Sequence, residues 1–282
     1  MLVALASLLA GCTVARFGYE MLPWFGMWQL ERNLSLDSAQ RQLASDRLDA
    51  LHDWHRQTQM PRYARLIEAE VGRLEGPLAA EDIGAWRAQM LSLWREPAER
   101  IAPDMADLAL TLRPAQIDRL EKRLAEATTE LRRKYLDGPP ARRLETRIER
   151  WQERLEWLLG DLSAAQLAQL RRLAADQPSD EAAWLDERQA RNDRLVGLLR
   201  RIERERPSRE MATAWSAAFL NGFWQSEDPA RARRLEANAA NGDRVAAAML
   251  NTASRHQREH MRAKLGDVER DVMRMIGRAA RP

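Results

Sequence analysis

Apolar residues that recur every three or four positions are the feature that most constrains the fold of this chain. One stripe comprises Ile117, Leu120, Leu124, Ala127, Leu131 and Tyr135, and the next comprises Leu144, Ile148, Trp151, Leu155 and Leu158. The spacing predicts amphipathic α-helices, because residues three and four apart share one helix face. Residues 137–140, with the sequence DGPP, predict a short turn between them. We therefore expect an antiparallel helical hairpin with arms of about 30 Å.

The same periodicity continues along most of the chain, and no segment alternates convincingly between apolar and polar residues. Ala, Leu, Arg and Glu are abundant, whereas Val, Ile, Tyr and Phe are sparse, as is typical of helical proteins. Pro61 interrupts a pattern that runs over residues 37–74 and should kink or divide that helix. The sequence predicts an all-α protein in which long amphipathic helices form antiparallel hairpins and a helical bundle, without a sheet.

The first residues have the features of a lipoprotein signal. Residues 1–10 are apolar, and the run LAGC at residues 9–12 has the small residues that a lipoprotein signal peptidase requires before a cysteine. Cys12 is the only cysteine and is the predicted lipid attachment site. A membrane span needs about 20 apolar residues, so this stretch is better suited to a signal peptide. The alternative is an ordinary secretory signal or a short span with a cysteine nearby by chance. One departure from the usual signal is that no Lys or Arg precedes the apolar stretch.

The positions of Gly and Pro, together with changes in composition, indicate four segments. We expect a signal peptide over residues 1–11, a lipid-anchored aromatic segment over 12–35, a main helical hairpin domain over 36–206 and a C-terminal helical unit over 207–282. The last boundary follows Pro207, after which Ala, Asn and Met become frequent. Thr13 stands where Asp would favour inner-membrane retention, so the expected location is the periplasmic face of the outer membrane.

A short pattern of leucine and glutamine recurs at expected helix starts. Its members are Leu36 with Gln40, Leu112 with Gln116, Leu162 and Ser163 with Gln166, and a degenerate copy in Ser254 with Gln257. In the third copy, the Ser163 hydroxyl can accept from the backbone N–H of Gln166, whose side chain reaches back to the cap. Helix capping alone is one explanation of the repeat. The other is a shared functional motif.

These residues resemble the LTxxQ motif of the Spy and CpxP family of periplasmic helical proteins, although Arg113 replaces the expected Thr or Ser. That resemblance implies binding of unfolded clients without nucleotide or catalysis. A second resemblance covers nearly the whole chain and is to an uncharacterised family of Gram-negative outer-membrane lipoproteins. It rests on the lipobox, on an aromatic segment at residues 19–28, and on the stretches LHDWHR (51–56), PRYA (61–64), LALTL (108–112) and WLDER (184–188). It implies the fold and the location, but no activity.

The aromatic segment contains Tyr19, Trp24, Phe25 and Trp28. Trp and Tyr are common at membrane interfaces, and the segment lies a few residues from Cys12. The alternative is that these side chains pack onto the first helices as an ordinary edge of the core.

All four histidines occur in helically spaced pairs, His52 with His55 and His256 with His260. Each pair shares a helix face and is a weak candidate for binding a divalent cation. His55 continues an apolar stripe and is better explained by packing, whereas His256 and His260 flank a stripe and should be solvated. Two ligands make a weak site, so we expect no physiological metal site.

The sequence offers no catalytic or cofactor-binding residues that stand out, because it has no phosphate-binding loop, nucleophile elbow or HExxH motif. Only 3 of the 45 basic residues are lysines, and the arginines are interleaved with acidic residues, a pattern typical of solvated helix faces and not of nucleic-acid binding. We expect no enzyme, no cofactor and no nucleic acid. The leading hypothesis is a lipid-anchored, Spy-like chaperone for unfolded clients; a structural scaffold for one defined partner is the alternative, and a metal-responsive protein is the third.

Overall fold

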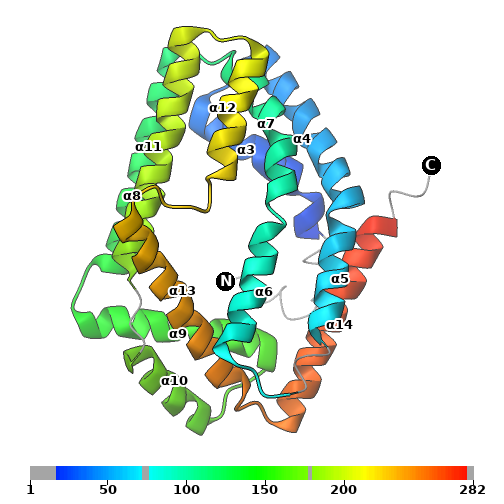
Figure 1. Cartoon of the computed structure of the whole chain (residues 1–282), viewed down its shortest axis with the longest axis vertical. Helices are drawn as coiled ribbons and strands as arrows, with labels where there is room; N and C mark the ends of the chain where they lie inside the picture. Colours follow the sequence, from blue (N-terminus) through cyan, green and yellow to red (C-terminus); the bar gives the residue numbers. More distant parts are fainter. Residues whose placement is uncertain (1–16, 72–75, 177–179, 278–282) are drawn as a thin grey trace. The chain divides into compact units, whose positions relative to one another are not determined.

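The structure is a computed structural model that describes residues 17–71, 76–176 and 180–277 of the 282-residue chain. In those ranges the secondary structure is α-helical and contains no strand, which confirms the all-α prediction (Figure 1). Cys12 and the predicted signal peptide lie outside the described residues. No helix of the described part is both long enough and apolar enough to cross a membrane.

Contacts divide the chain into two compact units. Unit 1 combines Met1–Gly76 with Arg255–Pro282, and unit 2 is Pro77–Ser254. The boundary expected at residue 207 therefore falls inside unit 2. The reason is that the helix after Pro207, α12 (Arg209–Asn221), packs along α7 (Arg95–Ala109), so the composition shift does not separate two units.

Unit 1 consists of helices from both ends of the chain. These are α3 (Leu22–Leu34), α4 (Ser38–Thr58), α5 (Met60–Val71) and α14 (Arg255–Gly277). α3 packs against α4, while α5 packs against α14 around a buried cluster of Met60, Ala64, Val272 and Met275. Pro61 lies in the first turn of α5, where a missing N–H costs little, and the expected interruption takes the form of a division between α4 and α5.

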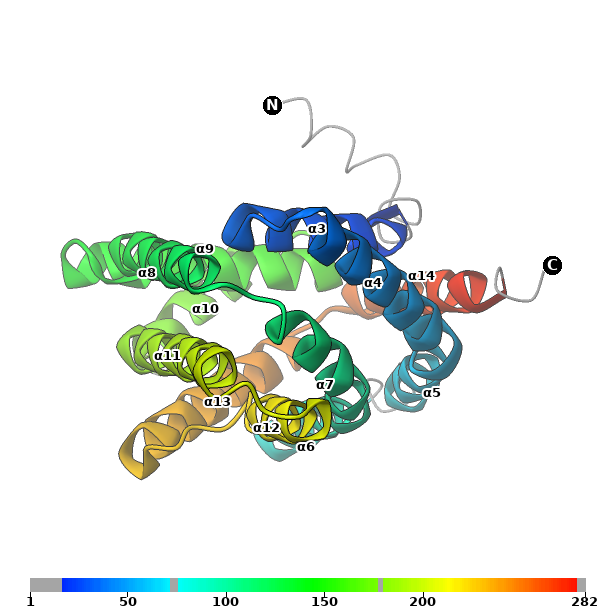
Figure 2. The same cartoon turned by 90° about the horizontal axis from the view of Figure 1, so that it is seen from above.

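Unit 2 contains the remaining helices. They are α6 (Ala80–Ser92), α7, α8 (Pro114–Leu136), α9 (Pro140–Leu159), α10 (Ala164–Asp176), α11 (Glu181–Glu205), α12 and α13 (Pro229–Leu250). The main packing pairs are α7 with α12, α8 with α11, α6 with α13 and α9 with α10. Figures 1 and 2 both show α7 alongside α12, although about 100 residues separate them in the sequence.

The two periodic stripes form helices at the predicted positions, but α8 packs mainly along α11 instead of α9. Gly138 between them has φ of 92°, a left-handed value that glycine adopts without strain. The following proline-containing turn directs α9 away from α8 (Figure 1). Ile117 and Leu120 of α8 and Ile148 and Leu155 of α9 are all buried, so each stripe still faces a core.

Small residues allow α7 and α12 to approach closely. Ala98, Ala102 and Ala106 recur every four residues along α7 and are almost completely buried. Ala98 and Ala102 share a buried cluster with Leu220 of α12, on which Ala212 and Ser216 are also completely buried. The contact is reinforced by a hydrogen bond of 2.9 Å from the indole Nε1 of Trp94 to the carbonyl oxygen of Leu220. Small side chains at this spacing leave no room for a larger residue.

Candidate functional site

Three of the four leucine and glutamine pairs occupy equivalent positions at helix starts. In each, the backbone N–H of the N-cap residue donates to the side-chain Oε1 of the glutamine three residues later. The N···O distances are 3.1 Å from Asp37 to Gln40, 3.0 Å from Arg113 to Gln116 and 2.9 Å from Ser163 to Gln166. The reciprocal bond, from glutamine N–H to the cap side chain, is present at Asp37 and at Ser163. These residues therefore satisfy the free N–H groups of helix starts.

The leucines and glutamines of the repeat are internal, whereas Ser163 and Ser254 are exposed. Leu36, Leu112 and Leu162 are buried, as are Gln40, Gln116, Gln166 and Gln257. In the degenerate copy, Ser254 ends unit 2 and Gln257 belongs to unit 1. Buried side chains cannot form a surface for clients, so the geometry of this repeat favours a structural role.

Sequence reasoning missed a variant of the same cap at α6. The backbone N–H of Ala79 donates to Oδ2 of Asp82 at 2.8 Å, which is the same arrangement with aspartate in place of glutamine. The signal was available, because Leu78 precedes Asp82 by the same four positions. A search restricted to glutamine does not find it.

The buried amide of Gln166 also makes a long-range contact. Its Nε2 donates to the carbonyl oxygen of Thr252 at 3.3 Å and to the Thr252 hydroxyl at 3.2 Å. The neighbouring Asn251 accepts from the backbone N–H of Leu78 and donates to its carbonyl oxygen, both at 2.8 Å. The turn after α13 is thus held to the starts of two other helices of unit 2, and this region serves as a structural junction.

His52 and His55 belong to a hydrogen-bonded aromatic cluster. Nδ1 of His55 lies 3.0 Å from the hydroxyl of Tyr19, and its Nε2 lies 3.2 Å from the hydroxyl of Tyr63. Nε2 of His52 donates to the carbonyl oxygen of Tyr19 at 3.1 Å. Burial lowers the pKa of His55, with a smaller contribution from His52, and burial raises the pKa of Tyr19 to about 12. Both ring nitrogens of His55 are therefore engaged in hydrogen bonds to tyrosines.

His256 and His260 lie at the start of α14, where His256 is exposed and His260 is half-buried. Among the described residues, no group of three or more His, Cys, Asp or Glu side chains is placed to hold a metal ion. The two histidine pairs lie on different helices of unit 1, His52 and His55 on α4 and His256 and His260 on α14.

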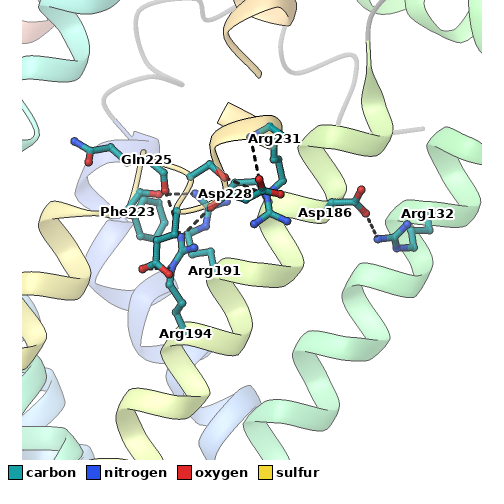
Figure 3. A network of polar contacts seen from close by, with 12 residues as sticks. Arg132, Asp186, Arg191, Arg194, Phe223, Gln225, Asp228 and Arg231 are labelled. Atoms are coloured by element: carbon teal, nitrogen blue, oxygen red, sulfur yellow. Dashed lines mark hydrogen bonds and ion pairs between the residues drawn. The ribbon is translucent and has the colours of Figure 1, made fainter. Parts of the chain in front are cut away.

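A charged network fixes the segment between α12 and α13 to α11 (Figure 3). The buried carboxylate of Glu187 accepts from Arg194 at 2.8 Å and from Arg231 at 2.9 Å. Burial raises the pKa of Glu187, but hydrogen bonds from Ser226, Arg194 and Arg231 and the charge of Arg194 outweigh it, so the net pKa is lowered. The carboxylate is ionised and its two oxygens are occupied. We interpret the network as a structural clamp.

Arg191 completes this clamp. Its guanidinium lies 4.3 Å from the centroid of the Phe223 ring and donates to the Phe223 carbonyl oxygen at 3.1 Å. Arg132 and Asp186 form a neighbouring ion pair between α8 and α11 at 2.7 Å (Figure 3). This network could not be predicted from the sequence, because its arginines are interleaved with acidic residues like those elsewhere in the chain.

The aromatic segment presents large apolar side chains to solvent on one face of α3 and the turn before it. Phe17 is 64% exposed, Trp24 61% and Trp28 42%, and Leu22 and Phe25 are also exposed. At 100° per residue, Trp24 and Trp28 lie about 40° apart on α3, and Phe17 precedes the turn at Met21. The guanidinium of Arg32 lies 5.3 Å from the Trp28 ring centroid. We call the exposed Phe17, Trp24, Phe25 and Trp28 the α3 aromatic face; Leu22 lies about 160° around the helix from Trp24 and is not part of it.

The opposite side of α3 packs on α4. A Cβ added at Gly26 would meet Cδ2 of Leu48 at 3.2 Å, so the backbones approach closely there, and Leu34 is buried. Tyr19 packs against His52, with ring centroids 4.5 Å apart. The aromatic segment is thus partly an edge of the core, through Tyr19, and partly a solvent-facing surface.

The described part of the chain is all-helical. Its unit 1 is formed by helices from both ends of the chain, and its helix α3 carries exposed aromatic side chains. The chain belongs to the family of unknown function DUF6279, whose family model matches residues 32–216. This confirms the expected membership of an uncharacterised family. No curated protein and no solved structure matches the chain.

Proposed function

We propose that this protein is a lipid-anchored envelope protein on the periplasmic face of the outer membrane, whose α3 aromatic face lies on the bilayer surface and whose unit 2 binds one defined partner protein. The observation that carries the first part is the α3 aromatic face. A contiguous exposed apolar patch indicates a binding surface, whereas isolated apolar residues on a surface do not.

The sequence supports the bilayer as the occupant of this face. Cys12, the expected acylation site, precedes Phe17 by five residues, which span at most about 18 Å when fully extended. An acylated Cys12 would therefore hold the α3 aromatic face close to the lipid headgroups. Trp and Phe side chains next to arginine are well suited to that zone, and an interfacial helix adds to the membrane affinity of acyl chains.

A defined partner is favoured over a range of unfolded clients. The other exposed large apolar residues are dispersed over several helices: Trp86, Met90, Leu91, Trp157, Trp184, Met211, Trp224 and Met273. A chaperone of the Spy type requires a broad amphiphilic surface, and the leucines and glutamines of the LTxxQ-like repeat that suggested one are buried. We therefore propose the scaffold in preference to the chaperone, and we propose no enzymatic or metal-responsive role.

Membrane fractionation and crosslinking test this proposal. Cys12→Ser should move the protein out of the outer-membrane fraction, because a hydroxyl is not alkylated by the enzyme that modifies lipoprotein cysteines. Crosslinked pull-down of the wild-type protein from intact cells should return one dominant envelope protein. Sedimentation of Cys12→Ser with outer membranes to the wild-type extent would refute the anchor. Recovery of many unrelated envelope proteins would refute the scaffold and restore the chaperone.

A further inference from the structure

Two adjoining cavities form a groove between α9 and α13 in unit 2. The larger has a volume of about 460 Å³ and the smaller about 200 Å³. Both are lined by Arg147, Asn238 and Asn241, so they form one continuous depression, which we call the α9–α13 groove. The larger cavity has the size typical of ligand sites in proteins.

Four arginines of α9 line this groove. Their positions, Arg143, Arg147, Arg150 and Arg154, are three or four apart and therefore share one face of the helix. Arg150 is paired with Glu181 at 3.1 Å, and Arg234 on the α13 side is paired with Asp180 at 2.6 and 3.0 Å. These two pairs neutralise both carboxylates among the lining residues.

The other three arginines of α9 that line the groove have no carboxylate partner among the described residues. Arg143 donates only to the carbonyl oxygen of Leu136, and Arg154 stacks at 6.0 Å on the Trp151 ring. Arg147 has neither an ion pair nor a hydrogen bond there, and its Nε is buried without a partner. The groove therefore carries an excess of three positive charges, and the Nε atoms of both Arg147 and Arg150 are buried in it without a hydrogen-bond partner among the described residues. A buried donor without a partner is costly and indicates a missing acceptor.

The arrangement of these charges indicates the shape of the ligand. Positions 143 and 154 are separated by about 16 Å along α9 at 1.5 Å per residue, so one compact anion cannot contact all three guanidinium groups. About five residues of extended peptide span that distance. The ring of Trp151 and the side chain of Val245 add apolar walls. We propose that the α9–α13 groove binds an extended acidic segment of a partner protein, with Arg143, Arg147 and Arg154 contacting its carboxylates.

This inference rests on the proposed scaffold function and names the chemistry of its partner. Guanidinium and carboxylate form charge-assisted, often bidentate hydrogen bonds, which account for both affinity and orientation. Such binding weakens as salt increases, because part of the groove is open to solvent.

A fluorescent hexaglutamate peptide tests the groove by anisotropy, with the full chain purified in non-ionic detergent. We expect saturable binding that weakens with salt. Arg147→Gln should weaken it about tenfold, and Arg147→Gln with Arg154→Gln about a hundredfold, since each lost contact to a charged group costs about 1.5 kcal/mol. Arg172→Gln is the matched control, because Arg172 is an exposed arginine of α10 outside both cavities, and it should bind within about twofold of wild type at the same loss of charge.

Equal binding by wild type and the double variant, with unchanged circular dichroism, would overturn the inference. So would displacement of the peptide by inorganic phosphate at equimolar concentration, which would indicate a site for a compact anion. Binding of the protein to phosphatidylglycerol vesicles that is lost in the double variant, while peptide binding persists, would assign the groove to lipid and also overturn the inference.

Crosslinked pull-down with the double variant separates the two proposals. Loss of the dominant wild-type partner supports the groove as its docking site. Retention of that partner overturns the groove while leaving the scaffold function in place. If the wild-type protein returns no dominant partner, the scaffold function fails, and the peptide measurement alone decides whether the groove binds acidic segments.

Discussion

Replacing the exposed tryptophans of α3 isolates their contribution to membrane binding. The Cys12→Ser protein provides the background, since acyl chains would otherwise dominate the affinity. Trp24 is 61% exposed, so about 120 Å² of a side chain of roughly 200 Å² is open to solvent. At about 25 cal/mol per Å², complete transfer to an apolar phase would contribute about 3 kcal/mol. An interfacial position immerses about half of that area, which leaves about 1.5 kcal/mol, or tenfold in affinity, for Trp24→Ser.

Co-sedimentation with lipid vesicles measures this affinity. The matched control is Trp157→Ser on α9, because Trp157 is similarly exposed, at 53%, but is not a member of the α3 aromatic face. We expect Trp24→Ser to weaken vesicle binding about tenfold and Trp157→Ser to change it less than twofold. Equal effects of the two substitutions, or no effect of either, would refute the assignment of the α3 aromatic face to the bilayer.

Three further predictions concern stability. Ser163→Ala should lower the free energy of unfolding by about 1 kcal/mol in denaturant titration through loss of a cap; an unchanged value would exclude a capping role. Ala102→Leu should lower it by about 1–3 kcal/mol or more through overpacking between α7 and α12, which an unchanged midpoint would contradict. Because the pKa of folded His55 lies below 6.5, the native state binds fewer protons, so stability should fall as pH drops below 6.5. His55→Gln should flatten that dependence, and a slope equal to wild type would exclude His55 as its source.

The helices of this protein were predictable because their signal is local. The stripes beginning at Ile117 and Leu144 each define an apolar face, and the helices α8 and α9 follow them. Periodicity does not say which helix covers a face, so the partner of α8 was wrongly expected to be α9. For the same reason, the change in composition after Pro207 did not show that α12 packs along α7.

The candidate sites were predictable only where sequence neighbours define them. The cap formed by Ser163 and Gln166 joins residues three apart, and the sequence identified it. The α3 aromatic face was left open between core and surface, because exposure depends on which helices pack nearby. The groove was not foreseen, since Arg147 and Arg150 have similar sequence surroundings. Only the folded chain gives Glu181 to Arg150 and leaves Arg147 without a partner.

The composition of unit 1 from both ends of the chain has a consequence for the order in which the protein can fold during export. α5 is synthesised early, but the residues that cover Met60 and Ala64 belong to α14, the last described helix. Unit 2 is contiguous in sequence and can complete its core before α14 packs against α5. Unit 1 is therefore the last part of the protein to close. If the chain is exported and anchored as proposed, the apolar surface of α5 would stay near the membrane until α14 covers it.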